Sequence, residues 1–151
     1  MPVIVVGADT LLGKAVMDEL LPRDSEVRAF VSSPQAAARL KERGVKVALG
    51  DVSDGSHVGG AALNAFCAVL IHEAATDDRE RSFADDPAGV LAAWAEGVND
   101  AEVTRTIVVW DEPPPAELAS ISSQTVVVPT LGQTPQAVAA EVGRLEDLAE
   151  L

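Results

Sequence analysis

Short apolar, β-branched runs alternate along this chain with longer segments of helical pattern. The runs occupy residues 3–6, 27–31, 45–49, 67–71, 106–110 and 125–128. They are apolar throughout and lack strict alternation with polar residues, as expected for strands that helices cover on both faces. This order of elements is typical of βαβ units and predicts a parallel sheet.

Helix signals separate the runs. Ser33-Pro34, Asp86-Pro87 and Thr134-Pro135 each place a capping residue before a proline at the first helical position. A further helix is expected within 56–65, although paired glycines lower its propensity, and residues 111–119 are expected to form a loop or a short helix. With right-handed crossovers, six strands predict an α/β fold, a three-layer doubly wound parallel sheet of the Rossmann type with order 3-2-1-4-5-6.

Composition narrows the function classes. The 151 residues fit one domain, 1–151, and leave no room for a separate substrate domain. The net charge of -13 argues against nucleic acid as a partner, because phosphate backbones would be repelled. No apolar run reaches the length of a membrane helix and no signal peptide is apparent, so a cytoplasmic protein without a membrane partner is expected. The two histidines and the acids show no metal-ligand spacing.

A glycine turn follows the first predicted strand. Its sequence is Gly7-Ala8-Asp9-Thr10-Leu11-Leu12-Gly13, and a helix is expected to open within it. The first glycine permits a tight turn, the last permits close packing of helix on strand, and the free helix amides favour a phosphate. The middle glycine of such turns is Thr10 here, with Asp9 beside it. Two readings stay open: a dinucleotide cradle, or a turn that Asp9 and Thr10 cap internally.

Two further positions bear on a nucleotide. Ser32 and Ser33 stand at the end of the second strand, where an acid would hold the ribose hydroxyls and a base would hold a 2′-phosphate. Asp51, followed by Val52, stands after the third strand, where an acid can meet the adenine amine; Asp51 or Asp54 could equally cap the next turn.

Together these places resemble the atypical short-chain dehydrogenase/reductase superfamily, especially its NmrA-like, NAD(P)H-binding branch. VIVVGADTLLG is similar to the family's strand and G-A-T-G-x-x-G turn, and VRAFVSSP to its V-R-A-L-V-R-x-P. LKERGVKVALGDVSD and CAVLIHEAA are similar to the segments around its third and fourth strands. The resemblance covers residues 1 to about 75 and implies NAD or NADP as cofactor, with the loop containing His72 and Ala74 beneath the nicotinamide.

The departures from the family concern cofactor choice and catalysis. The position of the arginine that binds a 2′-phosphate is Ser32 in this chain. Redox-active members use a tyrosine with a lysine four residues later, after the fifth strand. This chain has no tyrosine, and its lysines are Lys14, Lys41 and Lys46.

Other side chains offer weaker catalytic candidates. His72 and Glu73 close the fourth strand at the carboxyl end of the sheet, and Asp111 follows the fifth strand. His72 or Asp111 could move a proton, although a local hydrogen bond is the usual role of such a histidine. Trp110 could stack on a ring or belong to the core, and Cys67 is expected to be a buried, inert thiol. The charge run 77–81 is expected to be a solvated loop, with a lid as the alternative. Four acids are expected on the solvated face of the last helix: Glu141, Glu146, Asp147 and Glu150.

The sequence therefore favours a nucleotide-binding or regulatory protein that takes a dinucleotide or another adenine nucleotide. One alternative is an NAD(P)-dependent oxidoreductase or sugar-nucleotide epimerase-like enzyme with an acid/base other than tyrosine. The other is a ligand-free homodimeric interaction module that uses the apolar stripes of the helices after Pro87 and Pro135.

Overall fold

The computed structural model describes residues 1–111, 114 and 121–151. One six-stranded parallel sheet has the order β3-β2-β1-β4-β5-β6, so the predicted fold class and strand order are confirmed. The strands are β1 (Val3–Val6), β2 (Val27–Val31), β3 (Lys46–Leu49), β4 (Cys67–Ile71), β5 (Arg105–Trp110) and β6 (Gln124–Pro129). The helices are α1 (Leu11–Leu20), α2 (Pro34–Glu42), α3 (Gly55–Ala62), α4 (Glu73–Thr76), α5 (Pro87–Asp100) and α6 (Pro135–Asp147).

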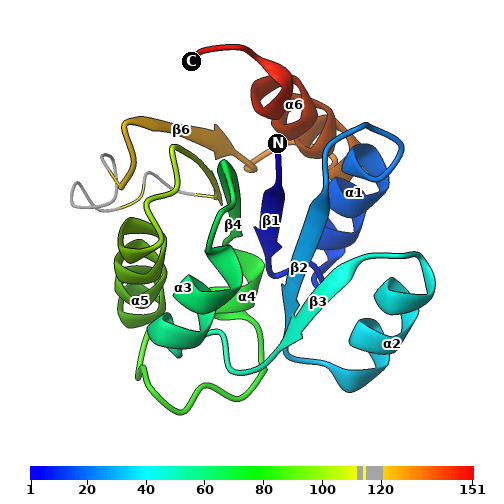
Figure 1. Cartoon of the computed structure of the whole chain (residues 1–151). Coiled ribbons are helices and arrows are strands. Elements are labelled where there is room, and N and C mark those ends of the chain that lie inside the picture. Colours follow the sequence, from blue (N-terminus) through cyan, green and yellow to red (C-terminus); the bar gives the residue numbers. More distant parts are fainter. Residues whose placement is uncertain (112–113, 115–120) are drawn as a thin grey trace.

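Helices cover both faces of the sheet (Figure 1). Alternate residues of β1 enter two different cores: Val3 and Val5 pack with α1, α2 and α6, whereas Ile4 and Val6 pack with α3, α4 and α5. All four residues are fully buried, which explains why the strand is apolar without alternation.

Local capping sets where the helices begin. The side chains of Ser33, Asp86 and Thr134 each accept a hydrogen bond from the amide three residues later, as their sequence position predicts. Asp54 does the same for α3. Gly44 has a positive φ of 82° directly after the C-cap of α2, a conformation that glycine adopts without strain. Most of the loop or short helix expected at 111–119 lies outside the described residues.

The apolar stripes of α5 and α6 belong to the protein's own core. Val90, Leu91, Trp94 and Val98 of α5 are fully buried, and the Trp94 indole N–H donates to the Val52 carbonyl at 2.7 Å. The α6 stripe packs against α1 and the sheet in the same way. The prediction that these stripes form a dimer surface is therefore wrong, because both stripes pack within the protein's own core.

A buried arginine lies at the C-terminal end of α6, where the sequence predicted a solvated acidic face. Arg105, the first residue of β5, is fully buried and donates to the carbonyl oxygens of Leu145 and Glu146 at 3.0 Å, at the helix C-terminus. A cation suits this end of a helix. Glu146 is only 7% exposed and accepts from the Ser25 hydroxyl at 3.2 Å, so its predicted place on the solvated face is wrong.

Two further sequence predictions concern burial and membrane helices. Cys67 is buried as expected, and burial raises the pKa of its thiol to about 12. Across the described ranges, none of the helices combines the length and apolar character needed to span a membrane.

Candidate functional site

The glycine turn between β1 and α1 has the backbone geometry that the sequence predicts. Gly7 has a φ of 92°, which glycine adopts without strain. A Cβ on Gly13 would lie 2.0 Å from the Gly7 carbonyl oxygen, so only glycine lets α1 begin this close to β1. These two glycines therefore bring the opening amides of α1 to the carboxyl edge of the sheet.

Thr10 caps this helix. Its Oγ1 accepts from the Gly13 amide and donates to the Gly7 carbonyl, both at 2.8 Å. The hydroxyl therefore takes one of the amides that a phosphate could have used. The internally capped reading is correct for Thr10.

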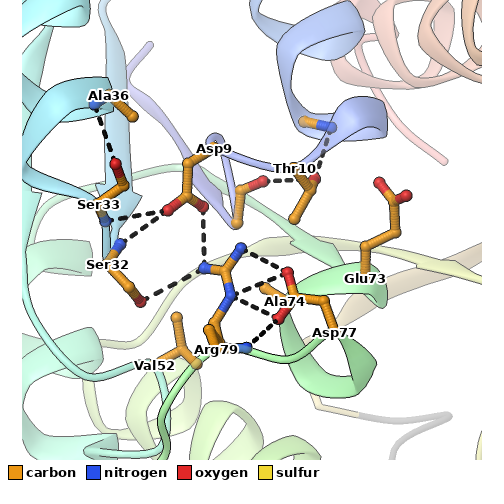
Figure 2. A network of polar contacts seen from close by, with 12 residues as sticks. Asp9, Thr10, Ser32, Ser33, Ala36, Val52, Glu73, Ala74, Asp77 and Arg79 are labelled. Atoms are coloured by element: carbon orange, nitrogen blue, oxygen red, sulfur yellow. Dashed lines mark hydrogen bonds and ion pairs between the residues drawn. The ribbon is translucent and has the colours of Figure 1, made fainter.

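Asp9 has a different role from the one expected, because its carboxylate is directed away from the α1 amides (Figure 2). Its Oδ2 accepts from the backbone amides of Ser32 at 2.9 Å and Ser33 at 3.2 Å, at the end of β2. Its Oδ1 pairs with Arg79 at 2.9 Å, and the Asp9 side chain is only 5% exposed. Asp9 thus ties the glycine turn to the second strand.

The acid that binds an amide at the N-terminus of α1 is Glu73. It is the first residue of α4, directly beyond β4, and its Oε1 accepts from the Leu12 amide at 2.7 Å. An anion at a helix N-terminus is favoured by the free N–H groups and by the helix dipole. The cradle therefore binds an anion, and that anion is a side chain of the same chain.

The segment 77–83 crosses the crevice, and its charge run is solvated only in part, because Asp78 and Glu80 are exposed whereas Arg79 is not. Arg79 has a side chain only 12% exposed and donates from Nε and Nη2 to Asp77 at 2.8 Å. Burial opposes the guanidinium charge, yet Asp77 and Asp9 raise the pKa of Arg79 above its ordinary value. Arg81 donates to the carbonyl of Ala74 at 2.9 Å, which fastens the segment to α4.

Asp51 holds the far end of the same segment. Its Oδ1 accepts from the amide and hydroxyl of Ser53, and its Oδ2 accepts from the Ser82 amide at 2.8 Å. Desolvation opposes ionisation, but the hydrogen bonds from Ser53 and Ser82 hold the pKa of Asp51 below its ordinary value. Asp51 therefore stabilises a turn, as one sequence reading expected, while it lines the crevice.

A cavity of about 500 Å³ lies under this segment. Its wall combines the ends of three strands with the crossing segment: Asp9, Ser32, Ser33, Gly50, Asp51 and side chains from residues 77–82. Among the described residues of that wall, Arg79 is the only cation, beside several carboxylates. The cavity is thus acidic, open to polar ligands, and placed where a doubly wound fold binds the adenosine half of a dinucleotide.

The other predicted residues lie closer to β4 and β5. His72 follows β4, and its Nδ1 lies 3.3 Å from Oδ1 of Asp111. The imidazole also packs on Trp110, with ring centroids 4.0 Å apart. Val52 and Ala74 are fully buried, so any contribution from them to a ligand site would come through the backbone.

Sequence reasoning placed Glu73 at the carboxyl end of the fourth strand and the charge run 77–81 over the crevice, but it named neither Glu73 nor Arg79 as a binding residue. Glu73 could have been found, because β4 neighbours β1 in the predicted order and parallel neighbours end at the same edge of a sheet. Arg79 gave no comparable signal, since its position depends on the path of a loop.

Comparison with known families gives one match. The sequence profile of a family described as NAD(P)H-binding matches residues 7–111, more than half of the chain. A search of curated protein sequences finds no match.

Solved structures share the fold at low identity. An anaerobillin reductase of Escherichia coli has a TM-score of 0.73 and 16% identity, with 99% of this chain and 92% of that chain covered. A Citrobacter triphenylmethane reductase complexed with NADP(H) has a TM-score of 0.61 and 18% identity, covering 95% of this chain and 46% of that one. A putative epimerase of Bacteroides thetaiotaomicron has a TM-score of 0.57 and 24% identity, covering 79% and 53%.

This chain thus spans most of the first of these proteins and about half of the other two. The comparisons agree with the resemblance drawn from the sequence, and they confirm the predicted cofactor class, NAD or NADP, without choosing between the two.

Proposed function

Because this chain belongs to the NAD(P)H-binding family, we propose that it binds a nicotinamide adenine dinucleotide as a non-catalytic, regulatory ligand. The pyrophosphate would lie at the turn from Gly7 to Gly13, and the adenosine in the cavity beside Ser32 and Asp51. The nicotinamide would point toward His72 at the end of β4. A smaller adenine nucleotide would use the same cavity.

One observation carries this proposal: the helix amide of Leu12 already holds a carboxylate oxygen at 2.7 Å. The close approach that Gly13 permits and the positive φ of Gly7 build a cradle that accepts an anion. The residues present therefore fit a pyrophosphate, provided that the Glu73 side chain rotates away. Ligand binding then competes with an internal acid.

The non-catalytic part of the proposal rests on the residues available. A bound nicotinamide supplies hydride exchange, and the reductases that the sequence resembles pair it with a tyrosine and a lysine. This chain contains no tyrosine. Its lysines lie on α1, on α2 and at the start of β3: Lys14, Lys41 and Lys46. That pair of proton-transfer residues is absent from the sequence.

A second candidate function is favoured by the contact between His72 and Asp111. The 3.3 Å approach of Asp111 to Nδ1 orients the imidazole, and Trp110 packs on its face. An oriented histidine beside a nicotinamide site can give or take the proton that accompanies hydride exchange. In that case the protein is an oxidoreductase with a histidine acid/base.

Thermal melting tests the binding proposal. The full chain is melted alone and with millimolar NAD, NADH, NADP or NADPH. A ligand that binds the native state raises the midpoint by mass action, and we expect a rise with at least one of the four. No rise with any of them would refute dinucleotide binding.

The histidine variant H72N separates the two functions. If His72 is an acid/base, H72N abolishes reduction of carbonyl substrates by NADH or NADPH while dinucleotide affinity is kept. The matched control is H57N, because His57 lies exposed on α3. If the wild-type chain binds the dinucleotide but reduces none of the carbonyls offered, the regulatory role is supported.

A further inference from the structure

The carboxylate of Asp9 lies at the end of β2, although its backbone belongs to the glycine turn. Its Oδ2 accepts from the amides of Ser32 and Ser33 at 2.9 and 3.2 Å. We propose that Asp9 is the residue that reads the adenosine ribose, and that it makes this site prefer NAD(H) over NADP(H). This inference rests on the proposed function.

The end of β2 is where doubly wound folds distinguish the two cofactors. An acid there accepts a hydrogen bond from the ribose 2′-hydroxyl, whereas an arginine accommodates a 2′-phosphate. In this chain the two residues at that place are serines, so the strand itself supplies no charge. Asp9 supplies the acid from another element, bound to the backbone of both serines.

The Asp9 carboxylate keeps capacity for a ligand. An ionised carboxylate has about four acceptor positions. Among the described residues three donors occupy it: the two serine amides on Oδ2 and Arg79 on Oδ1. Because Asp9 also lines the cavity of about 500 Å³, Oδ1 can accept a ribose hydroxyl. A 2′-phosphate brings no donor and adds negative charge beside it.

Arg79 could favour the opposite preference, for NADP(H), because it is a cation in the place where an arginine would bind a 2′-phosphate. Its Nη1 lies 3.3 Å from the Ser32 hydroxyl. However, its Nε and Nη2 pair with Asp77 and its Nη1 pairs with Asp9. Two carboxylates therefore share one guanidinium, and the three groups together carry a formal negative charge. Other acids of the cavity wall, such as Asp51, add to it.

Isothermal titration of the full chain with NADH and NADPH tests the inference. We expect NADPH to bind wild type roughly tenfold or more weakly than NADH, because its 2′-phosphate meets a like charge. In D9N the two affinities converge, mainly because NADPH binds more tightly. The matched control D77N also takes one carboxylate from Arg79, but away from the serine amides. Because it also frees Arg79, it should lose part of the preference for NADH, but less than D9N does.

The outcomes separate this inference from the proposed function. Equal binding of both cofactors by wild type, or tighter binding of NADPH, overturns the inference while dinucleotide binding stands. An unchanged preference in D9N shows that Asp9 is not the selector, and a preference lost equally in D77N assigns the effect to Arg79. A wild-type chain that binds neither cofactor overturns both. If D9N does not fold, D9S replaces it, with the same expected loss of preference.

Discussion

Replacing Glu73 by glutamine should strengthen dinucleotide binding and weaken the ligand-free protein at the same time. Glu73 accepts from the Leu12 amide at 2.7 Å, at the N-terminus of α1. Any pyrophosphate that uses this amide must first displace the carboxylate. Glutamine keeps an acceptor oxygen and the length of the side chain but removes the charge.

The size of the effect follows from the bond that is lost. A hydrogen bond to a charged group contributes about 1.5–3 kcal/mol, against roughly 1 kcal/mol for a neutral one. Displacing the side chain of residue 73 should therefore cost about 0.5–2 kcal/mol less in E73Q than in wild type, which corresponds to roughly two- to thirtyfold tighter binding. Loss of the charge at the helix N-terminus should cost the ligand-free protein about 0.3–1 kcal/mol.

Titration calorimetry with NADH measures the affinity, and urea denaturation without ligand measures the stability. The matched control is E80Q, because Glu80 lines the cavity of about 500 Å³ from the crossing segment and loses the same charge without contacting the Leu12 amide. E80Q should change affinity much less than E73Q. The reasoning is refuted if E73Q binds no more tightly than wild type, or if E80Q gains as much.

Three other perturbations test the contacts that hold the fold and the crevice. The R105M variant should lower the free energy of unfolding, measured in urea, by about 3 kcal/mol or more, because the buried carbonyls at the end of α6 lose their donor. The control R144A removes an exposed ion pair of α6 and should change the free energy of unfolding by less than about 1 kcal/mol. Desolvation opposes ionisation of both Asp51 and Asp77, but hydrogen bonds from Ser53 and Ser82 lower the pKa of Asp51, and Arg79 lowers the pKa of Asp77. The stabilisation from each carboxylate is therefore full above the unfolded pKa of about 4 and is lost as pH falls through the folded pKa. Melting from neutral pH to pH 3 should show this loss, and a D51N/D77N double variant with an unchanged acid limb would contradict it. T10A should cost about 1 kcal/mol in urea denaturation through loss of the α1 cap, whereas T10S should cost little.

Much of the fold could be predicted because its signals are local. A capping side chain and the amide it accepts are three residues apart, so Ser33, Asp86 and Thr134 could be recognised from their neighbours. Strands buried on both faces are apolar at every position, which makes the runs visible. The differences at strand ends are small: β5 begins at Arg105, one residue earlier than expected, because this arginine is buried under α6.

The candidate site could be predicted only in part, because its contacts join distant segments. The Leu12 amide and the Glu73 carboxylate are 61 residues apart in the chain, and Asp9 and Arg79 are 70 apart. Helical and strand periodicities carry no information about such pairs. The reading in which Asp9 caps its own helix, one of the two that the sequence left open, followed a sound local rule. It was wrong because the amides at the end of β2 and the Arg79 guanidinium offer this carboxylate more donors than the helix does.

The crevice resolves an apparent conflict between the acidity of the chain and its family. A protein with a net charge of -13 belongs to a family that binds an anionic cofactor. Its anion-binding amides are held by internal carboxylates: Glu73 on Leu12, and Asp9 on the two serines after β2. Each carboxylate stabilises the ligand-free crevice, and Glu73 also competes with the ligand for the Leu12 amide. Stability without ligand and affinity for ligand should therefore change in opposite directions at Glu73. At Asp9, a ribose hydroxyl can be accepted without displacing the carboxylate, so stability without ligand and affinity for ligand need not oppose each other. A carboxylate thus competes with the pyrophosphate at Glu73, whereas in the inference above a carboxylate at Asp9 selects the cofactor.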